Sequence, residues 1–295
     1  MTLAIVIPYY RLTFFEATLE SLANQTSKAF KVYIGDDASP ENPQDLLSKF
    51  EGKFDFEYHK FDNNLGGKSL VKQWERCVAL TDNQDYLMVL GDDDVLGDNA
   101  VQKFHEKIAS TPNAKVLRYA TQIIDSDGKI TTDVYTHPDG ETSVDFIFRK
   151  SRSSMSEYVF STRQISVHGF KDFPLAWYSD LVAVLDFSDF GPVHAINDAI
   201  VQVRVSEESI SGTRKGFAQK NAATFAFYTY LLTEKKHHFT ASQRRILLQK
   251  GSKSYSVDKK KIAMFFKLSY FYVRERYPSG YIDFIRLIIR SFSYE

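Results

Sequence analysis

The stretch that decides the fold is DYLMVLGDDDVL, residues 85–96. Its first half, Asp85–Leu90, is a short apolar run typical of a buried strand in a parallel sheet. Asp92, Asp93 and Asp94 follow directly, and their like charges repel one another unless something compensates them. A solvated acidic turn is one interpretation of these aspartates, and a bound cation is the other.

The same order of strand and polar loop occurs earlier in the chain. Strands are predicted over 4–8, 31–35, 54–59 and 85–90, and helices over 13–24, 44–50, 69–80 and 99–108. This alternation predicts an α/β fold with a mostly parallel sheet flanked by helices. Ligands of such sheets bind at the carboxyl ends of strands. Pro8–Arg11, Asp36–Asp37 and Asp92–Asp94 all follow predicted strands, so we expect them at one edge of the sheet.

The later part of the chain divides in two. A strand is predicted over 116–119, a hairpin over 123–131 around Asp127-Gly128, and a strand pair over 191–205. From residue 216 onward the pattern is helical and aromatic. We therefore predict an α/β domain over 1–213, which would contain any active site at the strand ends, and a basic, mainly helical region over 214–295.

Composition narrows the setting. No apolar run is long enough for a membrane-spanning helix, and the first residues are typical of a strand rather than a signal peptide. The single cysteine, Cys77, excludes an internal disulfide and fits a reducing compartment, so a cytoplasmic location is expected. Residues 214–295 hold 17 Lys and Arg against 5 Asp and Glu, whereas 1–213 hold 20 against 32. The acidic part suits metal or hydroxyl chemistry, and the basic part suits phosphates, anionic lipid or nucleic acid.

Each candidate motif has a chemical and a purely structural interpretation. Mg²⁺ and Mn²⁺ are held by one or two carboxylates together with phosphate oxygens of a ligand. The triple aspartate can supply the carboxylates. A carboxylate in Asp36-Asp37 can accept a hydrogen bond from a base N–H, and Pro8 to Tyr10 can stack on a base. NNLGGK, residues 63–68, offers main-chain amides and Lys68 to a phosphate. The structural alternatives are a turn aspartate for Asp36-Asp37, strand-end packing for Pro8 to Tyr10, and a plain turn for NNLGGK.

Asp180 lies at the start of an apolar run in LAWYSDLVAVLDF, residues 175–187. A carboxylate at a helix start, partly shielded from water, can act as a general base toward a sugar hydroxyl. A helix N-cap is the alternative. Trp177 and Tyr178 precede it and could form an aromatic wall for a sugar.

Together these segments resemble a family-2 glycosyltransferase of the GT-A fold, from Leu3 to about Gly212. The resemblance rests on the order and spacing of five segments. They are IVIPYYR (5–11), TLESLANQTSKAFKVYIGDDAS (18–39), NNLGG (63–67), the opening stretch, and the stretch from VHGF to ISG (167–212). Three positions depart from the family pattern: Gly91 takes the first place of Asp-x-Asp-Asp, Ser179 stands where Glu is common, and Ser206 where His is common.

The resemblance implies a role for each matching residue. In the donor site, Pro8, Tyr10 and Asp37 would line the base pocket, Asp92 and Asp93 would bind ribose, and Lys68 and Arg204 would also bind the donor. Asp94 with Asp92 would hold Mn²⁺ or Mg²⁺. Trp177 and Tyr178 would bind the acceptor, and Asp180 would be the catalytic base.

The expected activity is therefore inverting, metal-dependent transfer from a nucleoside-diphosphate sugar, with UDP favoured, to a glycan or lipid-linked acceptor in O-antigen or capsule assembly. Residues 255–292 would contact the inner face of the membrane peripherally, or pack on protein or in a homodimer; no nucleic-acid partner is expected. Two alternatives stay open. One is a non-catalytic glycan- or partner-binding module, and the other is a sugar-phosphate nucleotidyltransferase, whose Gly-rich signature IPYYRLTFF (7–15) lacks.

Overall fold

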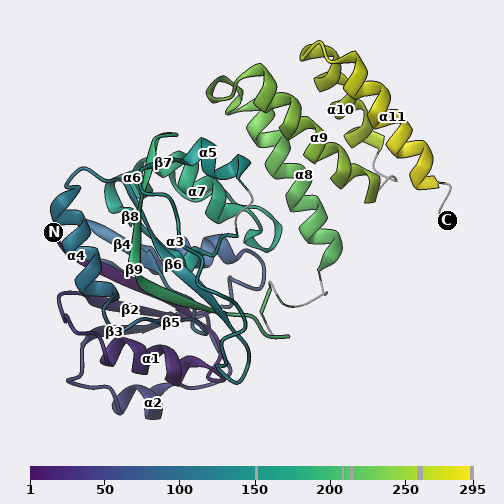
Figure 1. Cartoon of the computed structure of the whole chain (residues 1–295). Coiled ribbons are helices and arrows are strands. Elements are labelled where there is room, and N and C mark those ends of the chain that lie inside the picture. Colours follow the sequence, from purple (N-terminus) through teal and green to yellow (C-terminus); the bar gives the residue numbers. More distant parts are fainter. Residues whose placement is uncertain (150–151, 208, 211, 213–215, 258–261, 293–295) are drawn as a thin grey trace. The chain divides into compact units, whose positions relative to one another are not determined.

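The computed structural model describes residues 1–149, 152–207, 209–210, 212, 216–257 and 262–292 (Figure 1). The chain forms two compact units. The first contains Met1–Asp172 and Ser179–Thr213, and the second contains Phe173–Tyr178 and Arg214–Glu295.

A single mixed sheet organises the first unit (Figure 1). Its strands are β1 Leu3–Tyr9, β2 Lys31–Asp36, β3 Asp55–Lys60, β4 Tyr86–Val89, β5 Val95–Leu96, β6 Val116–Ile124, β7 Glu141–Thr142, β8 Tyr158–Ser161 and β9 Pro192–Arg204. The order is β3-β2-β1-β4-β8-β6-β9-β5, with β7 paired to β9. The pairs among β3, β2, β1 and β4 are parallel, as predicted, and so is β6 with β9. Strand β8 runs antiparallel to both of its neighbours.

Helices cover the sheet and follow from amphipathic segments of the sequence. They are α1 Phe15–Ala23, α2 Gln44–Ser48, α3 Leu70–Val78, α4 Ala100–Ser110, α5 Ser143–Phe148, α6 Thr162–His168 and α7 Ser179–Phe187, with a 3-10 turn η1 at Met155–Glu157. In α1, Phe15, Leu19 and Leu22 are fully buried against the sheet core, because they recur at helical spacing. Every residue of β4 is buried, which is why this strand is an uninterrupted apolar run.

The prediction of a strand pair over 191–205 is wrong. Strand β9 is one strand, and both of its halves run parallel to β6. The register moves from Tyr119 opposite Ile196 to Ala120 opposite Ile200, so three residues of β9 bulge out. The Asn197 side chain fixes this bulge, because it accepts from the His137 amide (2.9 Å) and donates to the His137 carbonyl (2.8 Å). A bulge bends a strand without reversing it.

The hairpin over 123–131 is confirmed. The Asp125 amide donates to the Lys129 carbonyl at 3.0 Å, and Ile124 and Ile130 form an antiparallel bridge. Gly128 has a φ of +79°, a conformation that glycine adopts without strain.

The second unit is helical in the part that the structure describes, as the sequence pattern predicts. It contains α8 Phe217–Thr233, α9 Ala241–Val257, α10 Ile262–Arg274 and α11 Pro278–Phe292, with 3-10 turns η2 at Pro174–Ala176 and η3 at Lys236–His238. Helix α9 packs against α8, α10 and α11. None of the described helices combines the length and apolar character that crossing a bilayer requires.

Candidate active site

The aspartate loop, Gly91–Asp94, connects β4 to β5 and is held by main-chain contacts. One oxygen of the Asp92 carboxylate accepts from the amides of Tyr10 (2.8 Å) and Arg11 (3.1 Å), immediately after β1. Asp92 therefore ties together the carboxyl ends of two adjacent strands. The predicted meeting of Pro8–Arg11 and Asp92–Asp94 at one edge of the sheet is confirmed.

Asp94 is the most deeply buried of the three aspartates, with 5% of its surface exposed. Its Oδ1 accepts from the amide of Arg204 at 2.8 Å, and the Ser156 side chain lowers the pKa of the carboxylate. Its carbonyl accepts from the Thr18 hydroxyl at 2.8 Å. Asp94 is therefore held through its carboxylate by β9 and through its main-chain carbonyl by α1.

The carboxylates of Asp93 and Asp94 approach the same point of the backbone. A Cβ atom placed on Gly91 would lie 2.8 Å from Asp93 Oδ1 and 3.1 Å from Asp94 Oδ2. Glycine at position 91, the departure from the family pattern, is therefore what allows both carboxylates to lie so close to the loop.

Burial and mutual repulsion weaken the acidity of the loop. Burial raises the pKa of Asp92 to about 6, with a further contribution from Asp94. Burial, then Asp94 and Asp92, raise the pKa of Asp93 to about 8, and burial also raises the pKa of Asp94. A divalent cation would relieve this repulsion, and the oxygen donors suit Mn²⁺ or Mg²⁺. Among the described residues, no group of three or more His, Cys, Asp and Glu side chains is arranged to hold a metal ion.

Arg204, predicted to bind the donor, is the last residue of β9. Its Nε donates to the Asp93 carbonyl at 2.9 Å and its Nη1 to the Asp125 carbonyl at 2.7 Å. The guanidinium also lies 4.4 Å from the ring centroid of Phe14. These contacts join the aspartate loop to the 123–131 hairpin, so Arg204 holds the loop in place.

A second cluster lies at the end of β2. The Asp37 carboxylate, predicted to contact the base, accepts from the amides of Leu65 (2.6 Å) and Gly66 (2.8 Å) and forms an ion pair with Arg76. A Cβ on Gly66 would lie 2.6 Å from Asp37 Oδ2, so this close approach requires glycine. Asp37 thus holds the NNLGGK turn, on which Lys68 is exposed.

The residues Pro8, Tyr9 and Tyr10, at the carboxyl end of β1, differ in exposure. Pro8 is half-buried and pairs in register with Gly35 of β2. Tyr9 is fully buried, and its hydroxyl donates to the Glu41 carbonyl at 2.9 Å. Tyr10 is 37% exposed, so its ring is accessible while its amide is bound to Asp92.

Asp180 is the second residue of α7 and is half-buried. Its Oδ2 accepts from the Ser153 hydroxyl, and burial raises its pKa above the ordinary value of 3.8. Ser153 Oγ also lies 2.7 Å from the hydroxyl of the buried Tyr158. A carboxylate with a raised pKa at a helix start has the properties of a general base.

The linking segment, residues 153–158, was not identified from the sequence. The Ser153 hydroxyl donates to Asp180, and the Ser156 hydroxyl accepts from the Gly91 amide of the aspartate loop at 3.0 Å. Asp180 and the aspartate loop therefore contact the same segment, at positions 153 and 156. Ser154 and Glu157 form a capping box in η1, a pattern visible in the sequence as Ser-x-x-Glu.

A buried ion pair supports this segment. Arg118 of β6 donates to Glu157 Oε1 through Nε (3.2 Å) and Nη2 (2.8 Å), and both side chains are at most 2% exposed. Arg118 Nη2 also donates to the Arg152 carbonyl at 2.6 Å. An ion pair at this depth is held in one geometry, since separating it would leave a buried charge.

Trp177 and Tyr178, predicted to bind the acceptor, belong to the second unit. The Tyr178 ring stacks on Phe227 with centroids 4.5 Å apart, and Lys220 Nζ lies 4.9 Å from the Trp177 ring. Their aromatic surfaces are therefore partly used in packing against α8.

Comparison with solved structures agrees with this architecture. S. aureus TarS 1–349 in complex with UDP-GlcNAc matches with a TM-score of 0.68 at 15% identity, over 98% of this chain and 82% of that chain. The same fragment with UDP matches with a TM-score of 0.64 at 16% identity, over 88% and 75%. GalNAc-T7 with UDP, GalNAc and Mn²⁺ matches with a TM-score of 0.55 at 10% identity, over 81% and 52%. Comparison with curated protein sequences finds no match.

The fold is that of a GT-A glycosyltransferase, as the sequence analysis predicts. The sequence model described as glycosyl transferase family 2 matches residues 4–162, more than half of the chain. The chain therefore belongs to glycosyl transferase family 2, and the predicted family and enzyme class are confirmed.

Proposed function

We propose that the protein transfers a sugar from a UDP-sugar to an acceptor hydroxyl with inversion at the anomeric carbon. The acceptor oxygen attacks the anomeric carbon while the bond between that carbon and the diphosphate oxygen breaks. The proton of the hydroxyl passes to Asp180, and UDP leaves. The single observation that carries this proposal is the linking segment, which binds the raised-pKa carboxylate of Asp180 and the aspartate loop within four residues.

The donor is assigned by chemistry at the strand ends. The exposed ring of Tyr10, with Pro8 beside it, offers a stacking surface for uracil, while Asp37 shapes the neighbouring turn that carries Lys68. Asp92 and Asp93 would face ribose. UDP is favoured because TarS and GalNAc-T7 were solved with UDP or UDP-GlcNAc.

A divalent metal fits the aspartate loop, since Asp93 and Asp94 converge beside Gly91 with raised pKa values. Asp94 would be its ligand, with Asp92 or Asp93 beside it, and Mn²⁺ or Mg²⁺ bound there would neutralise charge on the diphosphate. Arg204 and Ser156 hold the loop in position. Asp180 accepts the proton, and Ser153 orients its carboxylate.

The acceptor is proposed to be lipid-linked, as in O-antigen or capsule assembly, and presented at the inner face of the membrane. Helix α10 supports this, because Ile262, Phe266, Tyr270 and Val273 recur on one helical face and are each at least 61% exposed. The basic excess of residues 214–295 suits an anionic surface. Residues 258–261 of the predicted 255–292 membrane contact lie outside the described residues. A homodimer through the same face is the alternative.

Replacing Phe266 with Ser tests whether the exposed apolar face of α10 contacts the membrane. We expect weaker sedimentation with vesicles that contain phosphatidylglycerol and no change in oligomeric state. A shift from dimer to monomer in light scattering would favour the homodimer.

Replacing Asp180 with Asn tests the catalytic assignment. General-base removal costs about 10²–10⁴-fold in rate, so release of UDP from the UDP-sugar should fall by this factor. Thermal stabilisation by UDP and Mn²⁺ should persist, because Asp180 is proposed to contact the acceptor. Asp45→Asn, the same change at an exposed residue of α2, is the matched control and should retain wild-type turnover. Unchanged turnover in the folded Asp180 variant would remove this residue from the role. Absence of UDP release from every UDP-sugar in the wild type would favour the binding-module alternative.

A further inference from the structure

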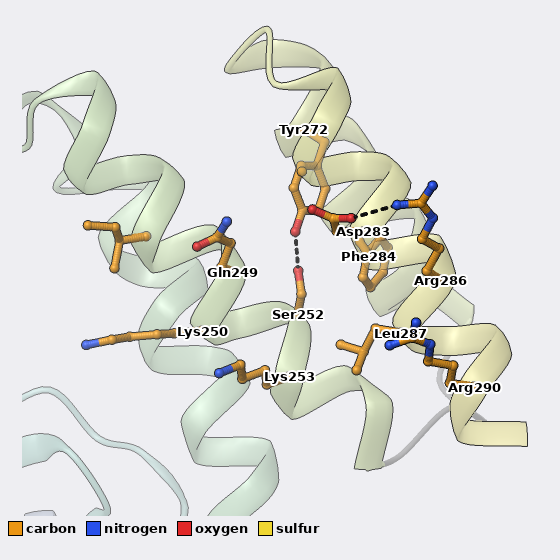
Figure 2. A pocket seen from close by; sticks show the side chains of 12 residues that line it. Gln249, Lys250, Ser252, Lys253, Tyr272, Asp283, Phe284, Arg286, Leu287 and Arg290 are labelled. Carbon is orange, nitrogen blue, oxygen red and sulfur yellow. Dashed lines mark hydrogen bonds and ion pairs between the residues drawn. The ribbon is translucent and has the colours of Figure 1, made fainter. Parts of the chain in front are cut away.

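A pocket of about 550 Å³ lies within the second unit, between the facing sides of α9 and α11 (Figure 2). Its volume is in the range of small-molecule sites. Nothing in the proposed transfer reaction uses this pocket.

The inner part of the pocket is apolar and fixed. Phe284 is 2% exposed, and Leu287 lies one helical turn beyond it on α11. The hydroxyls of Tyr272 and Ser252 lie 2.9 Å apart and satisfy each other, as the dashed line in Figure 2 marks. This inner surface suits hydrocarbon more than a polar group.

Four of the remaining lining side chains are basic. Lys250 and Lys253 come from α9, and Arg286 and Arg290 from α11, on either side of the Tyr272–Ser252 pair in Figure 2. Asp283 is the one carboxylate among the lining residues, and it accepts from Arg286 Nη1 at 3.3 Å. Burial, together with the charge of Lys253, lowers the pKa of Lys250. Among the lining residues, basic side chains therefore outnumber carboxylates by four to one.

We propose that this pocket binds an amphiphile that carries a phosphate or diphosphate group. Lysine and arginine side chains from the two helices contact the phosphate oxygens through charge-assisted hydrogen bonds. The hydrocarbon part lies along Leu287 and Phe284. Such a ligand combines the two surfaces that the pocket offers, whereas a nucleotide or free phosphate would leave the apolar part in contact with water.

Calorimetric titration of the full chain with geranyl diphosphate and with inorganic pyrophosphate tests the proposal. EDTA is present, so that the aspartate loop of the first unit recruits neither ligand through a metal. In the double variant Lys253→Glu/Arg290→Glu we expect affinity for geranyl diphosphate to fall at least tenfold. Lys267→Glu, a single charge reversal of the same kind at an exposed residue of α10 that does not line the pocket, should remain within threefold of the wild type.

A second variant tests whether the hydrocarbon part of the ligand lies against Leu287. Leu287→Ser should weaken geranyl diphosphate at least fivefold and leave pyrophosphate unchanged. Equal binding of the two ligands by the wild type, with no effect of Leu287→Ser, would overturn the amphiphile and leave a phosphate site. Equal loss in Lys267→Glu and the double variant, or no loss in either, would overturn the site itself. Thermal stabilisation by UDP and Mn²⁺, measured on the same protein preparations without EDTA, should persist in all variants, which separates this result from the proposed transfer reaction.

Discussion

Replacing Gly91 with Ala should impair metal binding while leaving the fold intact. The added Cβ would lie 2.8 Å from Asp93 Oδ1 and 3.1 Å from Asp94 Oδ2, and ordinary contacts begin near 3.4 Å. The Asp93 oxygen must therefore withdraw by about 0.6 Å and the Asp94 oxygen by about 0.3 Å. Both shifts exceed the tolerance of about 0.2 Å that metal–ligand distances allow.

The expected loss follows from this displacement. Disturbing the groups that orient metal ligands typically costs about 10–100-fold in affinity, or about 1.4–2.8 kcal/mol. Calorimetric titration of Mn²⁺ in the presence of UDP measures it. The free energy of unfolding without metal should change by less than about 1 kcal/mol, since the loop keeps its main-chain partners.

Gly128→Ala is the contrasting control. At a φ of +79° with open space around it, alanine should cost about 1–2 kcal/mol of stability and leave Mn²⁺ affinity unchanged. An Mn²⁺ affinity of Gly91→Ala within twofold of the wild type, in a folded protein, would refute the convergence of Asp93 and Asp94 on the metal.

Three further predictions concern the charged groups around the site. Because the pKa of Asp92 is raised to about 6 and that of Asp93 to about 8, the native state binds more protons than the unfolded state between about pH 4 and 8, so the unfolding free energy in EDTA should fall as pH rises. Asp93→Asn should flatten this fall in urea titrations at pH 5 and 8, and an unchanged slope would contradict the assignment. Ser153→Ala removes a donor that lowers the pKa of Asp180, so the acid limb of the kcat/KM profile should move to higher pH, and a fixed limb would argue against Asp180 as the base. Arg118→Met should cost about 3–5 kcal/mol in chemical denaturation because it leaves Glu157 buried and charged, whereas Lys115→Met, which breaks an exposed pair with Asp189, should cost less than about 1 kcal/mol; equal costs would refute this reasoning.

The sheet could be predicted because its central strands are buried on both faces. Strands β1, β2 and β4 are nearly continuous apolar runs, and each is followed by the polar residues that form one edge of the site. The bulge in β9 could not be predicted in this way, since three extra residues interrupt the periodicity and leave two segments that resemble a pair of strands.

The aspartate loop and Asp180 could be located from the sequence, but their supports could not. Asp92 binds the amides of Tyr10 and Arg11, and a residue's type does not reveal which main-chain groups it will meet. The linking segment is short and has no apolar period, so only its capping box was visible in advance. The contact between Gly91 and Ser156 joins residues 65 positions apart in the sequence, so it arises from tertiary packing.

The linking segment also determines where this enzyme can tolerate changes in chain length. Between Ser153 and Ser156, one added or deleted residue would detach either Asp180 or the aspartate loop, because both are held by side chains three positions apart. The tip of the 123–131 hairpin is exposed around Gly128, where no neighbouring atom lies within contact distance, so extra residues there meet no obstacle. Length variation among descendants of this sequence should therefore accumulate at the hairpin and be absent from the linking segment.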